Sequence, residues 1–75
     1  MTLQIQLEQA RLRWEYFARE CQKFEEKYQI NSEIFLQMFE RGELGDDVAY
    51  FEWYSAKKGF DLWEKRYHAL MKMIE

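Results

Sequence analysis

Apolar residues recur with alternating spacings of four and three along the first third of the chain. They are Leu3, Leu7, Ala10, Trp14, Phe17, Cys21, Phe24 and Tyr28. A seven-residue repeat with two apolar positions is typical of a helix that packs lengthwise against another helix. The pattern predicts a helix over residues 3–29, and these eight positions form its seam.

The last third of the chain carries the same repeat. Its seam consists of Ala49, Trp53, Ala56, Phe60, Trp63, Tyr67, Leu70 and Ile74. The pattern predicts a helix over 47–74, with Asp46 as the N-cap and Asp47 in the first turn, where a carboxylate suits the helix dipole. Gly59 lies inside this helix and costs about 1 kcal/mol relative to Ala. We expect it to let a bulky ring of the facing helix approach closely.

A short amphipathic segment joins the two repeats. Asn31 or Ser32 caps a predicted helix over 32–41, and the apolar face of this helix consists of Ile34, Phe35, Met38 and Phe39. Gly42 suits the left-handed residue that ends such a helix. Gly45 suits the bend before the last helix begins.

Two repeats of matching length with a short linker predict an all-α fold. The chain contains no proline and no alternating strand pattern. We expect an antiparallel helical hairpin of two long helices with coiled-coil-like packing, closed by the short helix, as a single domain over 1–75. The alternative is that both repeats serve a longer coiled coil made of several chains.

The size and composition of the chain limit how it can be stabilised and where it works. A chain of 75 residues allows one domain, and its single cysteine, Cys21, excludes an intrachain disulfide. Aromatic residues make up 19% of the sequence, which argues against intrinsic disorder. No apolar run is long enough to span a membrane, and the N-terminal residues do not resemble a secretory signal. We therefore expect a cytoplasmic protein with a reduced thiol.

Acidic residues concentrate in the middle of the chain. Residues 31–52 carry six acidic groups and one basic group, whereas residues 1–30 are balanced and residues 53–75 carry five basic and three acidic groups. An acidic patch repels a phosphate backbone and attracts a basic protein surface. We expect a protein partner, and no direct contact with nucleic acid.

The chain has more large apolar residues than a two-helix hairpin can bury. Those outside both seams include Ile5, Leu12, Tyr16, Leu62, Met71 and Met73. Apolar surface of this kind usually marks an interface. The best candidate is the ring-rich start of the last helix with its acidic rim, formed by Glu43, Asp46, Asp47, Tyr50, Phe51, Glu52 and Tyr54. The alternative is that the three rings pack inside the hairpin, against Ile34, Phe35, Met38, Phe39 and Leu44.

Groups suited to catalysis or metal binding are few. His68 is the only histidine, and Cys21 falls in a seam, where a small thiol is a routine core residue. The acidic stretch over 43–52 lacks the alternating oxygen ligands of a calcium loop. We expect no enzymatic activity, no metal and no cofactor, and we interpret the FEEKY and DLWEKR stretches as solvated helix faces.

The run YQINSEIFLQMFERGELGDDVAYFEWYSAKKGFDLWEKRYHAL, over residues 28–70, resembles a class of small helical prokaryotic proteins. The shared features are a tyrosine, a short helix with phenylalanine, the GELGDD turn and the YFEWY block. Many proteins of this class resemble antitoxins of two-gene toxin–antitoxin operons. The resemblance implies a non-catalytic protein that binds and neutralises a small basic toxin encoded by an adjacent gene. The alternative function is that of a homo-oligomeric coiled-coil protein, and a homodimer is compatible with either.

Overall fold

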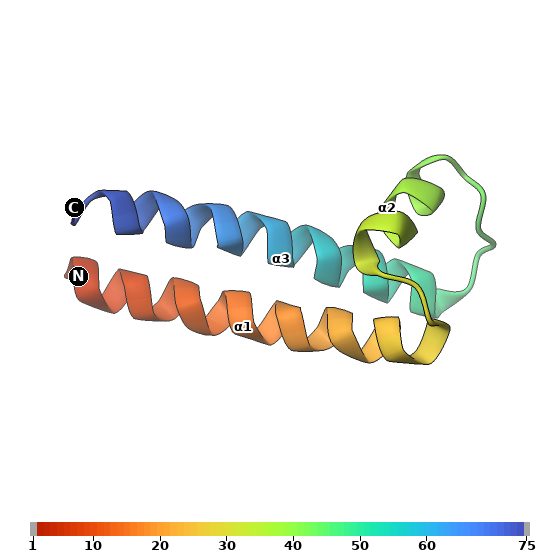
Figure 1. The fold of residues 1–75 in the computed structure, drawn as a ribbon, viewed down its shortest axis with the longest axis horizontal. Helices are drawn as coiled ribbons and strands as arrows, with labels where there is room; N and C mark the ends of the chain where they lie inside the picture. The colour runs from red at the N-terminus through yellow and green to blue at the C-terminus, as the bar shows by residue number, and fades with distance from the viewer. Residues whose placement is uncertain (1, 75) are drawn as a thin grey trace.

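The computed structural model describes residues 2–74 and confirms the all-α hairpin (Figure 1). Helix α1 runs over Leu3–Tyr28, α2 over Ser32–Glu40 and α3 over Val48–Lys72. The two long helices lie side by side in opposite directions, in a molecule that measures 43 × 20 × 18 Å. At the closed end of the hairpin, α2 and the loop after it connect α1 to α3. The first and last residues of the predicted 1–75 domain lie outside the described residues.

Trp53 is the centre of the core. Its side chain is fully buried, and its ring stacks on Phe35 of α2 with 3.9 Å between the ring centroids. Phe24 and Tyr28 of α1 stack on the same indole at 5.6 and 5.4 Å. The indole Nε1 donates a hydrogen bond of 2.9 Å to Ser32 Oγ, which satisfies the one polar atom of the ring. One residue of α3 therefore holds both other helices.

The predicted seams lie between α1 and α3 with one exception. Ala10, Cys21 and Ala56 are buried, and the larger seam residues are mostly half-buried. Ile74, predicted as the last seam residue, is 55% exposed. The prediction is wrong there because α3 ends at Lys72, two residues before it.

Gly59 makes room for a ring of the facing helix, as the sequence predicts. A Cβ atom at this position would lie 2.7 Å from Cε1 of Phe17. No side chain larger than hydrogen fits at that distance without moving the ring. The glycine weakens α3 locally but allows α1 and α3 to approach closely at this level.

The N-cap hydrogen bonds define the first residues of α2 and α3. The Oδ1 atom of Asp47 accepts the N–H of Ala49 at 2.9 Å, so α3 begins at Val48. The prediction that Asp46 is the cap and Asp47 lies in the first turn is wrong, because either of two adjacent aspartates is able to cap. For α2 the cap is Asn31, whose Oδ1 accepts the N–H of Ile34 at 2.8 Å.

Left-handed residues end the first two helices. Gly42 has φ 72°, and the N–H groups of Gly42 and Glu43 donate to the carbonyls of Phe39 and Met38 at 3.1 and 3.0 Å. These two hydrogen bonds form a Schellman motif and confirm the predicted role of Gly42, with α2 ending one residue earlier than predicted. Helix α1 ends at Tyr28, also one residue early, because Gln29 adopts φ 59°. The sequence carries no signal for this, since glutamine rarely adopts a left-handed conformation.

Candidate protein-binding site

The three predicted rings at the start of α3 divide between core and surface. Tyr50 is half-buried, with its ring 5.7 Å from that of Tyr28 and 6.2 Å from that of Phe35. Tyr54 is also half-buried and stacks on Phe39 of α2 at 4.6 Å. Tyr50 and Tyr54 therefore pack against α2, as in the alternative interpretation of the sequence.

Phe51 differs from its two neighbours because its side chain is 53% exposed. Its ring meets the ring of Phe39 at 5.4 Å and 90°, an edge-to-face contact that positions it without covering it. Val48, one turn earlier on the same helix face, is 69% exposed. These two side chains form the exposed apolar part of the start of α3.

The carboxylates of the preceding loop have different environments. Glu43 forms an ion pair with Arg41, with 2.9 Å between Oε2 and Nε. Asp47 is engaged as the N-cap of α3. Asp46 is exposed. Asp46 and Asp47 directly precede the exposed apolar pair, so they form the nearest part of the predicted acidic rim.

Glu52 points in a different direction from Phe51. It is turned toward α1, where it lines a shallow hollow together with Tyr16 and Glu20. Phe51 and Glu52 are adjacent in the chain, and successive side chains of a helix point about 100° apart. Glu52 therefore points toward α1 rather than beside Phe51, one turn after Val48 on α3.

A buried lysine near the start of α2 was not singled out by the sequence. Lys57 is 7% exposed, and its Nζ lies 2.7 Å from Asp61 Oδ1 and 3.0 Å from Glu33 Oε2. Burial alone would lower the pKa of Lys57, but hydrogen bonds to Asp61 and Glu33, together with their charges, raise it above its ordinary value. The i, i+4 spacing of Lys57 and Asp61 is visible in the sequence, whereas the contact with α2 is purely tertiary.

Two further groups of α1 surround the start of α2. The Oε2 atom of Glu25 accepts the N–H of Ser32 at 2.8 Å. Burial raises the pKa of the Cys21 thiol, an effect larger than the opposing one of the Ser32 hydroxyl. A protonated thiol is a weak nucleophile, so Cys21 acts as a core residue here. The roles of Glu25 and Asp61 correct the interpretation of FEEKY and DLWEKR as merely solvated faces.

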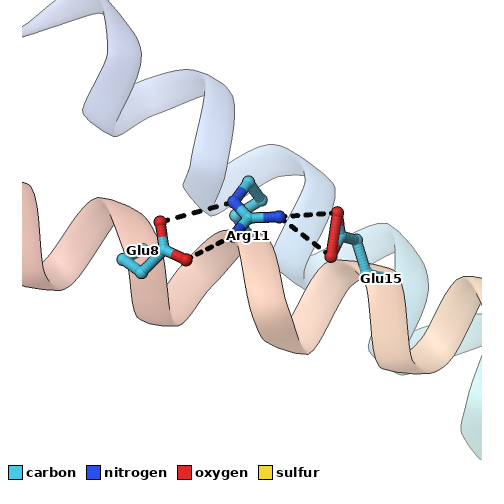
Figure 2. A network of polar contacts seen from close by, with 3 residues as sticks. All are labelled: Glu8, Arg11 and Glu15. Atoms are coloured by element: carbon cyan, nitrogen blue, oxygen red, sulfur yellow. Dashed lines mark hydrogen bonds and ion pairs between the residues drawn. The ribbon is translucent and has the colours of Figure 1, made fainter.

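A polar network covers the middle of α1 (Figure 2). Arg11 Nη1 donates to both carboxylate oxygens of Glu15, at 3.0 and 2.8 Å, and Nε and Nη2 donate to Glu8. The hydrogen bonds with Glu8 and the charge of Glu15 raise the pKa of Arg11 above its ordinary value. All three side chains belong to one helix, so the network pairs Arg11 within α1.

Two arginines and the histidine pack on tryptophan rings. Arg13 and Arg66 place their guanidinium carbons 4.9 and 4.7 Å from the ring of Trp63. His68 is exposed and meets Trp14 edge-on at 5.4 Å. Within residues 2–74, no group of three His, Cys, Asp or Glu side chains is arranged to hold a metal ion. No helix in this part of the chain is long and apolar enough to cross a membrane.

Comparison of the chain with protein-family models, with curated proteins and with solved structures finds no match. The fold places the protein among small all-α helical hairpins. Its function is argued from the surfaces described above, of which the closed end carries most of the predicted site.

Proposed function

We propose that this protein is a non-catalytic, cytoplasmic protein-binding module that holds a basic partner at its closed end. The observation that carries the proposal is the exposure of Val48 and Phe51, at 69% and 53%, directly after Asp46 and Asp47. Exposed apolar side chains anchor an interface, and carboxylates around them steer a basic surface toward it. The half-buried rings beneath would hold this surface rigid, which lowers the entropic cost of binding.

The particular partner that we propose is a small basic toxin, neutralised by one copy of this protein for each toxin. The resemblance of residues 28–70 to antitoxins supports this. The charge of residues 31–52, with six acidic groups and one basic group, supports a basic partner independently, because toxins that handle RNA tend to be basic. Such a protein would act by covering the toxin and would need no catalytic group of its own.

The first experiment is a pull-down with the tagged full-length chain from its native host, with the captured proteins identified by mass spectrometry. The expected result is one small basic protein, encoded beside this one and recovered in equal amount. Expression of that protein alone should arrest growth, and co-expression should relieve the arrest. Recovery of the bait alone would contradict the proposal and favour the homo-oligomeric alternative.

A pair of variants then locates the surface on the recovered partner. Phe51→Ala combined with Asp46→Lys should raise the dissociation constant at least about tenfold, because it removes the exposed ring and reverses a nearby charge. Neither side chain is buried, so helicity by circular dichroism should be retained. Leu12→Ala is the matched control, since Leu12 is 52% exposed but lies on the outer side of α1. Equal weakening by the control would overturn the assignment of the closed end.

A further inference from the structure

Among the helices of residues 2–74, none packs on one long flank of the hairpin. The α3 residues that contact α2 include Tyr50, Trp53, Tyr54 and Lys57. With about 100° between successive residues, Glu52, Ser55, Gly59, Leu62 and Arg66 lie on the opposite side of α3. We call this opposite side, together with the adjoining side of α1, the Gly59 flank.

The α1 side of this flank is identified by the hollows that the two helices share. Tyr16 and Glu20 line one hollow with Glu52 and Ser55. Arg13 lines the next hollow with Arg66 and Trp63. The flank therefore has arginines toward the chain termini and glutamates toward the closed end. Tyr16, at 51% exposure, and Leu62, at 44%, lie between them.

Along the hairpin, the acidic and basic residues of the flank lie at equal distances on either side of one point, which is the contact between Phe17 and Gly59. On α3, Glu52 and Arg66 lie seven residues on either side of Gly59. On α1, Arg13 and Glu20 have their midpoint between Tyr16 and Phe17. The ring of Phe17 lies against Gly59, so the two midpoints fall at the same level.

The geometry points to a second copy of this chain as the occupant of the Gly59 flank. Consider a two-fold axis at the level of Phe17 and Gly59 that is perpendicular to the helices and lies in the plane of the interface. It places each long helix antiparallel to the same helix of the second copy. Glu52 then lies opposite Arg66 of the second copy, and Arg13 opposite Glu20 of the second copy. The same surface serves both subunits, as a closed two-fold dimer requires. The product is a four-helix bundle with α2 of each chain left uncovered.

Side-chain size agrees with the same symmetry. Ser55 and Leu62 have their midpoint next to Gly59, so each leucine meets a serine of the other copy. A large residue opposite a small one lets two helices interdigitate. Within residues 2–74, neither Glu52 nor Arg66 takes part in an ion pair, so both are free to form one across the axis.

The flank runs along both long helices, in a molecule that is 43 Å long. A standard interface buries about 800 Å² on each partner. Below roughly 80 residues a single core rarely supplies more than about 5 kcal/mol, and association is a common remedy. The inference does not rest on the proposed toxin, because its observations concern residues 52–66 of α3 and residues 13–20 of α1.

Charge reversal tests the arrangement by sedimentation analysis of the full chain. The wild-type protein should be a dimer, and Glu52→Arg or Arg66→Glu alone should raise the dissociation constant at least about tenfold, because two like charges then face each other. The double variant Glu52→Arg with Arg66→Glu restores both pairs and should return close to the wild-type value. A monomeric wild type, unaffected single variants, or a double variant weaker than either single one would each overturn the proposal. Circular dichroism of every variant checks that the fold is retained.

Cross-linking tests the position of the axis without changing charge. In the Tyr16→Cys variant the introduced thiol lies close to the same thiol of the second copy. A short bis-maleimide should therefore convert most of the protein into covalent dimer. Gln22→Cys is the matched control, since Gln22 is exposed but lies about 120° around α1 from Tyr16. The native Cys21 is buried and should not react. Equal cross-linking of the two variants would contradict the two-fold arrangement.

Discussion

At the residue scale, the contact between Phe17 and Gly59 sets how closely the two long helices approach. Gly59→Ala should improve helix propensity by about 1 kcal/mol but force a methyl group into the ring, and overpacking of this kind costs about 1–3 kcal/mol. We expect the free energy of unfolding to fall by about 1 kcal/mol in urea denaturation. In a Phe17→Leu background the obstacle is gone, so the same substitution should raise the free energy of unfolding. The same sign in both backgrounds would show that the ring is not the cause.

Because the thiol of Cys21 is buried, we expect the free energy of unfolding to depend on pH in the alkaline range. Its pKa in the folded protein is raised above the ordinary value of 9.0 by burial, so the folded state holds the proton more tightly than the unfolded state. The resulting contribution to stability is complete below pH 9.0 and is lost as pH rises through the pKa of the folded state. Urea denaturation between neutral and alkaline pH should show this loss, and Cys21→Ala should reduce it. An unchanged slope in the variant would assign the loss to other groups.

At the scale of the helices, the two adjacent aspartates before α3 have unequal roles. Asp47 accepts the N–H of Ala49, whereas Asp46 makes no such bond. Asp47→Ala should lower the free energy of unfolding by about 1 kcal/mol, the usual cost of losing an N-cap. Asp46→Ala should change it by less than about 0.5 kcal/mol, as exposed substitutions do. Thermal and urea denaturation of the pair would detect a reversed order, which would restore Asp46 as the cap.

Helix α2 depends on packing more than on its own propensity. It has nine residues, too few for an isolated helix to be stable in water. Phe35 is fully buried against Trp53, whereas Ile34 beside it is 47% exposed. Phe35→Ala should therefore cost about 3–5 kcal/mol in the free energy of unfolding, and Ile34→Ala a small fraction of that. Similar losses for the two variants in urea denaturation would mean that α2 is not held by its buried ring.

At the scale of the whole molecule, the proposed dimer links stability to protein concentration. Mass action favours the folded state of a self-associating chain as concentration rises. A tenfold increase should raise the midpoint of thermal unfolding by about 3–6 °C for a chain of this size. Glu52→Arg should remove most of this dependence while keeping the helical circular dichroism spectrum. A midpoint that is independent of concentration in the wild type would contradict the dimer.

Much of the fold could be predicted because its signals are local and repeated. The two seams have many members each, so the predicted helices survive errors of one or two residues at their ends, as at Gln29 and Ile74. The candidate site was harder to predict. Tyr50, Phe51 and Tyr54 look alike in the sequence, yet two of them are half-buried and one is exposed. Their difference depends on where α2 packs, which no residue of that block encodes.

The sequence by itself determined the helices and the glycine that ends α2, because spacing and backbone conformation are properties of neighbouring residues. The need for a glycine at position 59 is tertiary, because it comes from the ring of Phe17 on the facing helix. Only the tertiary structure decided which flank α2 covers. That choice buries Lys57 between two carboxylates and leaves the Gly59 flank open. Burial arises from segments distant in the chain, so the surfaces available for a partner are a property of the packed molecule.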